Sequence, residues 1–65
     1  MHVTVNGQPR NLPDATTVAA LIEQFNLTPD KVAVELNRRL LKTERYDTSL
    51  HDGDIVELVT FVGGG

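Results

Sequence analysis

One segment of this 65-residue chain carries a helical hydrophobic stripe, and it is flanked by segments that alternate like strands. Four apolar residues recur at positions i, i+3, i+4 and i+7, the spacing of one helix face: Val18, Leu21, Ile22 and Phe25. Thr16 or Thr17 is suited to cap the start of this helix, and Asn26 can end it in the left-handed conformation. A lone amphipathic helix must bury its stripe against another element, so we expect it to lie across one face of a sheet.

The flanking segments predict a mixed sheet of four to five strands. Residues 1–5 and 32–36 alternate between apolar and polar positions. Asn6-Gly7 favours a tight type I′ hairpin, because both central residues of that turn need positive φ. The returning segment, residues 8–12, contains a proline and should form an edge strand. A further short strand is expected near residues 40–41, after a turn, and Tyr46 should anchor the polar stretch that follows.

The last predicted strand, residues 55–62, has a buried face and an outward face. Val56 and Leu58 should face the helix, which directs the alternate residues away from it. Glu57, Val59 and Phe61 therefore form a candidate partner interface, since exposed apolar patches are typical of binding surfaces.

The chain closes with Gly63-Gly64-Gly65. A carboxylate on glycine is the least hindered one a protein can present, and residues without Cβ can enter a narrow slot. We expect Gly65 to be the modified residue, with Val62, Gly63 and Gly64 threading into the active site of a partner. The predicted organisation is a folded domain, residues 1–62, and a flexible tail, residues 63–65.

Composition excludes several classes of function. The net charge of −3 argues against broad affinity for nucleic acid or membranes, and the absence of cysteine excludes disulfides and thiolate metal sites. His2 and His51 lack companions at metal-ligand spacing, so no metal site and no catalytic residue is predicted. The start of the chain is no signal peptide, and we expect a cytoplasmic protein. Four cations concentrate in one segment and form either a solvated turn or a docking patch: Arg38, Arg39, Lys42 and Arg45.

Four stretches in this order resemble the ThiS family, the sulfur carriers of thiamin biosynthesis. They are Val5-Asn6-Gly7, residues 32–37, residues 50–57 and the closing Val59-Thr60-Phe61-Val62-Gly63-Gly64-Gly65. The resemblance covers the whole chain and implies an α+β fold, the ubiquitin-like β-grasp. One departure is Arg38, where the family pattern leads us to expect glycine after Asn37.

The resemblance also implies a function. An adenylating, E1-like partner would use ATP to activate the Gly65 carboxylate, and a cysteine persulfide protein would supply sulfur to form a thiocarboxylate. A thiazole synthase would then take the sulfur for the thiazole ring of thiamin. The chain itself would be no enzyme and would bind no cofactor. Three alternatives stay open: the small subunit of molybdopterin synthase, a ubiquitin-like protein modifier, and an inert β-grasp interaction module.

Overall fold

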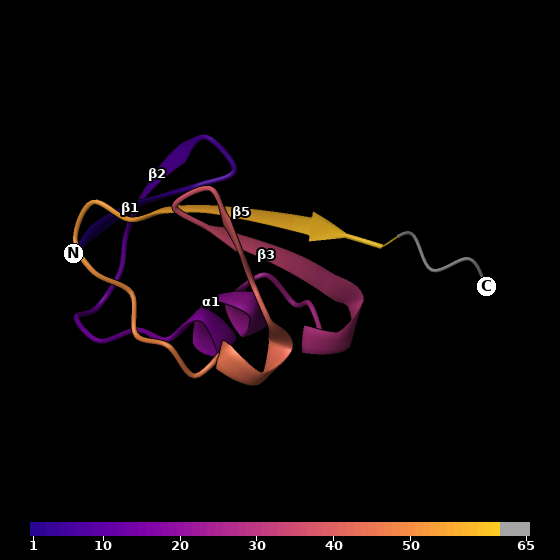
Figure 1. The fold of residues 1–65 in the computed structure, drawn as a ribbon. Coiled ribbons are helices and arrows are strands. Elements are labelled where there is room, and N and C mark those ends of the chain that lie inside the picture. Colours follow the sequence, from indigo (N-terminus) through magenta and orange to yellow (C-terminus); the bar gives the residue numbers. More distant parts are fainter. Residues whose placement is uncertain (62–65) are drawn as a thin grey trace.

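The computed structural model describes residues 1–61, which form a five-stranded sheet with one α-helix across a single face (Figure 1). The helix, α1, spans Val18–Gln24. The strands are β1 (His2–Val5), β2 (Gln8–Asn11), β3 (Val32–Leu36), β4 (Arg39–Leu41) and β5 (Ile55–Thr60). Two 3₁₀ turns complete the set, η1 (Pro29–Lys31) before β3 and η2 (Thr43–Arg45) after β4.

The sheet is mixed, with the strand order β2-β1-β5-β3-β4. β1 and β5 run parallel at its centre, and the other neighbouring pairs are antiparallel. This is the β-grasp arrangement that the resemblance to the ThiS family implies. β2 lies at the edge of the sheet, where Pro9 is tolerated because no neighbouring strand on that side needs its N–H.

Both predicted hairpin turns use two residues with positive φ. Asn6 and Gly7 have φ values of 50° and 78°, as a type I′ turn requires. Asn37 and Arg38 have φ values of 53° and 70°, so the second turn keeps the same conformation even though arginine stands in place of glycine. The left-handed region costs a residue with a Cβ about 1–2 kcal/mol, so Arg38 is a strained position.

Asparagine side chains fix the two turns to β5. Asn6 Oδ1 accepts a hydrogen bond from the Leu58 N–H at 2.7 Å, beyond the point where β1 ends. Asn37 Oδ1 accepts from the Ile55 N–H at 2.9 Å, and its Nδ2 donates to Asp54 at 3.0 Å. Both turns therefore help to set the position of β5 in the sheet.

The ends of α1 follow from local sequence. Thr17 is the N-cap, and its hydroxyl accepts from the Ala20 N–H at 3.1 Å. Asn26 adopts φ of 59°, and the Leu27 N–H then donates to the Ile22 carbonyl at 3.2 Å. The Ile22 carbonyl also accepts from the Phe25 N–H at 3.1 Å, so the left-handed ending gives the last turn of the helix a second bond to this carbonyl.

The core lies between α1 and the inner face of the sheet. Its buried residues are Val3, Val5, Leu12, Val18, Leu21, Ile22, Val32, Val34, Tyr46, Leu50, Val56 and Leu58. Phe25 differs from the periodic prediction, because α1 ends at Gln24 and Phe25 is only partly buried at the rim of the core. The Arg10 guanidinium covers its ring at 4.5 Å, which is a cation–π contact.

The last strand is shorter than the sequence predicts. β5 ends at Thr60, which pairs with Val32, the first residue of β3. η1 occupies the residues before Val32, so the ladder has no strand to continue against. One further bond follows, from the Phe61 N–H to the Lys31 carbonyl at 3.0 Å. The predicted domain limit at Val62 and the predicted flexible tail, residues 63–65, lie outside the described residues.

Candidate functional site

The predicted reactive end lies just past the described part of the chain. Gly65, and the threading residues Val62, Gly63 and Gly64, fall outside residues 1–61. Phe61 is the last described residue, and β5 directs the chain away from the body of the domain towards it (Figure 1). The part of the site that the structure describes is therefore the surface next to residue 62.

β5 presents the outward face that its alternation predicts. Val56 and Leu58 are buried under α1, whereas Val59 and Phe61 are 56% and 57% exposed. Glu57 lies between the apolar positions of this outward face and is exposed. The predicted register of β5 is therefore confirmed, and the binding role of Glu57, Val59 and Phe61 stays a prediction.

Neighbouring strands extend this surface. Leu40 of β4 is 71% exposed and lies opposite Glu35 of β3, and Glu35 lies opposite Glu57 of β5. Ala33 lies opposite Val59. We call this surface the open face, and it consists of Ile55, Glu57, Val59 and Phe61 with Ala33, Glu35 and Leu40. Within residues 1–61 every large exposed hydrophobic side chain belongs to it: Leu40, Ile55, Val59 and Phe61.

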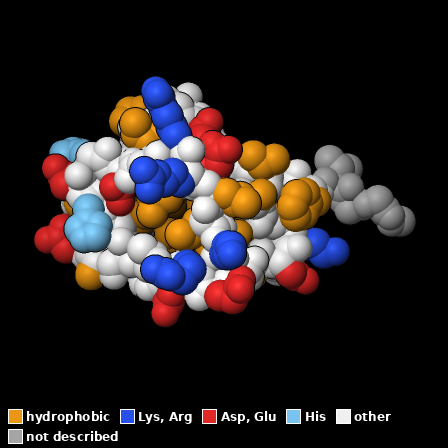
Figure 2. Space-filling view, viewed as in Figure 1, with side chains coloured by type: hydrophobic (Ala, Val, Ile, Leu, Met, Phe, Trp, Pro, Cys, Tyr) orange, Lys and Arg blue, Asp and Glu red, His pale blue; other side chains and the backbone are white. Residues whose placement is uncertain are grey.

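Two apolar side chains of the open face, Val59 and Phe61, lie where the described chain ends. Figure 2 shows hydrophobic side chains clustered at the end of the described surface that β5 reaches, with charged side chains around them. Exposed hydrophobic residues scattered singly need no explanation, but a contiguous group is typical of an interaction surface. Sequence alternation identifies the β5 members, whereas Leu40 joins only through the pairing of β4 with β3.

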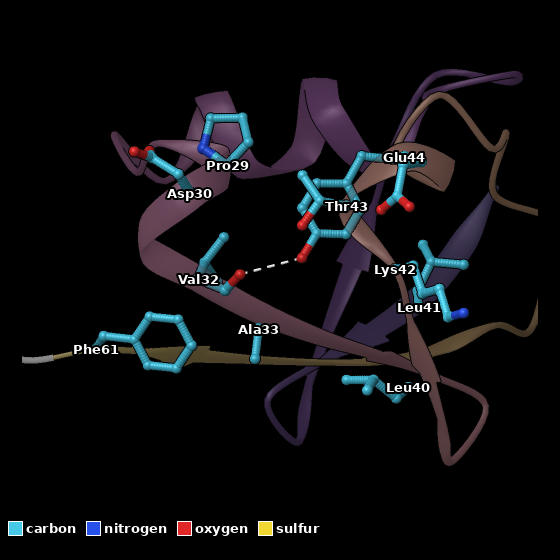
Figure 3. A pocket seen from close by; sticks show the side chains of 11 residues that line it. Pro29, Asp30, Val32, Ala33, Leu40, Leu41, Lys42, Thr43, Glu44 and Phe61 are labelled. Atoms are coloured by element: carbon cyan, nitrogen blue, oxygen red, sulfur yellow. Dashed lines mark hydrogen bonds between the residues drawn. The ribbon is translucent and has the colours of Figure 1, made fainter.

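A groove continues the open face around the β3–β4 edge. It has a volume of about 290 Å³, and Phe61, Ala33 and Leu40 line one side of it (Figure 3). Pro29 and Asp30 of η1 lie across from Phe61 (Figure 3). Its floor is fixed by Tyr46, whose buried hydroxyl donates to the Val32 carbonyl at 3.0 Å.

An acidic pair lies in the middle of the open face. Glu35 and Glu57 are direct neighbours across the antiparallel β3–β5 ladder, and both are exposed. Like charges directly opposite each other destabilise the pairing of two strands. Neither carboxylate has an ion-pair partner in residues 1–61, where the one ion pair joins the N-terminal ammonium to Asp14.

The other residues that the sequence singled out lie at the surface of the described chain. No three His, Asp or Glu side chains in the described part of the chain are placed to hold a metal ion. His51 is exposed in a turn, where its backbone N–H donates to Asp54 at 2.8 Å. Arg38, Arg39, Lys42 and Arg45 are all exposed along β4 and η2. No helix within residues 1–61 is long and apolar enough to cross a membrane.

Comparison with known proteins identifies the family of the chain. The ThiS family model matches residues 3–65. The sulfur carrier protein ThiS of Thermus thermophilus is 39% identical over 97% of this chain and 98% of its own length. A thiazole synthase of Paramagnetospirillum magneticum is 38% identical over all of this chain, which spans only a fifth of that protein.

A solved structure agrees with the sequence comparison. The crystal structure of the thiamine biosynthesis protein ThiS from Geobacter metallireducens superimposes with a TM-score of 0.81 at 36% identity, and the match covers the whole of both chains. The family match extends through the closing glycines, which lie next to the open face in sequence. The chain therefore belongs to the ThiS family.

Proposed function

We propose that this chain is a sulfur carrier protein that supplies sulfur for the thiazole ring of thiamin, with Gly65 as the residue that carries it. The supporting observation is the family match over residues 3–65, which includes Gly63-Gly64-Gly65. The Thermus thermophilus relative of nearly equal length is named as a sulfur carrier. In this role the chain is a protein substrate for its partners and no enzyme.

Activation comes first, because a carboxylate is a poor electrophile. An adenylating partner transfers AMP from ATP to the Gly65 carboxylate, which forms an acyl-adenylate and releases pyrophosphate. The chain binds no ATP of its own in this proposal, since the partner holds the nucleotide. Its contribution is an unhindered carboxyl carbon, which the glycines can bring close to the α-phosphate of ATP.

Sulfur transfer follows from the activated carbonyl. The terminal sulfur of a cysteine persulfide on a donor protein attacks the Gly65 carbonyl carbon, and AMP leaves. A thiol then attacks the sulfur of the donor cysteine and breaks the S–S bond. The acyl-bound sulfur leaves as the thiocarboxylate, and the thiol and the donor cysteine form a disulfide. The chain has no cysteine that could compete for the activated carbonyl.

The open face supplies the binding energy for these steps. Holding residues 62–65 in one conformation costs roughly 1–2 kcal/mol of backbone entropy per residue, and glycine loses most. Contacts elsewhere must offset several kcal/mol, and Val59 and Phe61 are the exposed apolar side chains nearest in sequence to those residues. Burial of such side chains, aromatic ones above all, often dominates the energy of an interface.

A thiazole synthase is the acceptor that we propose. The Paramagnetospirillum magneticum relative is named a thiazole synthase, and a fifth of its length matches this entire chain. A carrier segment within such a polypeptide is suited to deliver sulfur to the remainder of it. We propose the same transfer between separate proteins here, in the cytoplasm, where ATP is available for activation.

Intact-protein mass spectrometry tests the activation and sulfur transfer. The protein is incubated with its cognate adenylating enzyme, ATP and a persulfide donor, and we expect one oxygen to be replaced by sulfur. A variant with one residue added after Gly65 is the matched control. It should gain no sulfur, because a displacement of about 1 Å at a reacting centre can lower a rate on the order of a hundredfold. Sulfur on the extended chain would contradict the proposal, and higher-mass conjugates in cell extract would indicate a protein modifier instead.

A further inference from the structure

The register of β3 and β5 places two carboxylates side by side on the open face. Glu35 pairs directly with Glu57. In an antiparallel ladder, hydrogen-bonded pairs alternate with non-hydrogen-bonded pairs. The bond from the Phe61 N–H to the Lys31 carbonyl makes these two residues a hydrogen-bonded pair. Residues 35 and 57 lie four positions away on their strands, so they form a hydrogen-bonded pair as well. Their Cβ atoms are then about 5 Å apart and project from the same face.

Apolar residues surround this acidic pair. Ile55 and Val59 are the outward neighbours of Glu57 along β5, and both are large exposed hydrophobic residues. On the other side, Leu40 lies opposite Glu35 and is 71% exposed. A protein surface that covers the apolar part of the open face therefore also covers the two carboxylates.

Covering the pair without a compensating charge is unfavourable. Two neighbouring carboxylates lose their water together, and each needs a cation or hydrogen-bond donors once it is buried. Within residues 1–61 no lysine or arginine lies within ion-pair distance of Glu35 or Glu57. A docking molecule that brings a positive charge between them would therefore satisfy both carboxylates.

We propose that the open face binds the adenylating partner through a cationic side chain, an arginine in particular, inserted between Glu35 and Glu57 and flanked by apolar contacts. The inference rests on the proposed function and adds the chemistry of the partner surface. Arginine fits best because its planar fork of donors can serve two carboxylates at once, whereas lysine acts as a point charge. The repulsion between Glu35 and Glu57 in the free protein is relieved when the cation arrives.

The double variant E35Q/E57Q tests this contact, because glutamine keeps the shape of glutamate and removes its charge. The control E23Q/D47N changes the net charge equally at two exposed residues outside the open face, in α1 and after η2. Calorimetry with the cognate adenylating enzyme gives the dissociation constant at low and high salt, per folded molecule. We expect E35Q/E57Q to raise Kd at least tenfold at low salt and the control to raise it less than twofold, with the difference shrinking at high salt.

ATP–pyrophosphate exchange separates this inference from the proposed function. The control E23Q/D47N should support the exchange rate of the wild type, because Gly65 and the open face are both unchanged in it. A Kd for E35Q/E57Q within twofold of the control, alongside normal exchange by the wild type, would overturn the cation contact alone. No exchange with the wild type would overturn the proposed function itself. The melting temperature of E35Q/E57Q should equal or exceed that of the wild type, since a repulsive pair has been removed.

Discussion

Replacing Phe61 with alanine should weaken partner binding more than folding. Phe61 is 57% exposed at the end of β5, so folding already buries less than half of its side chain. Complete burial of a phenylalanine contributes about 1.5–3 kcal/mol, so covering the exposed part in a complex contributes about 1–2 kcal/mol. We therefore expect Kd for the adenylating enzyme to rise about five- to thirty-fold. The free energy of unfolding should fall by no more than about 1 kcal/mol.

Phe25, the other phenylalanine of the chain, is the matched control. It packs against the core at the end of α1, beneath Arg10. Phe25→Ala should lower the free energy of unfolding by about 2 kcal/mol, less than a fully buried phenylalanine would, and leave Kd per folded molecule unchanged. Chemical denaturation and calorimetry on both variants measure the two quantities. Unchanged affinity of Phe61→Ala, with a large loss of stability, would refute the assignment of Phe61 to a docking surface.

Four further substitutions test the fold that positions the open face. Leu21→Ala or Leu58→Ala should each cost about 2–5 kcal/mol in chemical denaturation, because both side chains are buried between α1 and the sheet; neutral variants would contradict the core assignment. Arg38→Gly should raise the free energy of unfolding by about 1 kcal/mol, since glycine tolerates φ of 70°, and a destabilised variant would show that the turn is unstrained. Tyr46→Phe should cost about 1–3 kcal/mol, because the Val32 carbonyl loses its buried donor, and an unchanged thermal melt would argue against that bond.

Local sequence chemistry predicts the elements of this fold well. The Asn6-Gly7 pair, the Thr17 cap and the left-handed Asn26 each act within a few residues of themselves, and all three have the predicted conformation. The alternation in β5 also predicts which side chains face α1. These features are predictable because steric limits on φ and the two side-chain periods operate locally.

Features that depend on contacts between distant segments cannot be predicted from local sequence patterns. Leu12 and Leu50 lie in no periodic segment, yet both are buried where loops cross the core. Phe25 fits the helical spacing but lies past the end of α1, so the geometry of the helix end decides its burial.

The candidate site shows the same division between local and distant effects. The outward orientation of Val59 and Phe61 follows from the alternation along β5 alone. The addition of Leu40 to the open face and the pairing of Glu35 with Glu57 depend on strand order and register, which no single segment of the sequence specifies. The reactive role of Gly65 rests on chemistry and family membership, because the described residues end at Phe61.

Transfer of isotopically labelled sulfur tests the central claim most directly. The carrier is loaded with ³⁴S at Gly65 by the adenylating enzyme and a labelled persulfide donor, purified, and mixed with thiazole synthase and its other substrates without any further sulfur source. We expect a single turnover in which the thiazole product carries ³⁴S and the carrier returns to its carboxylate mass. An unlabelled product, or a loaded carrier that keeps its sulfur while the synthase turns over, would contradict the account.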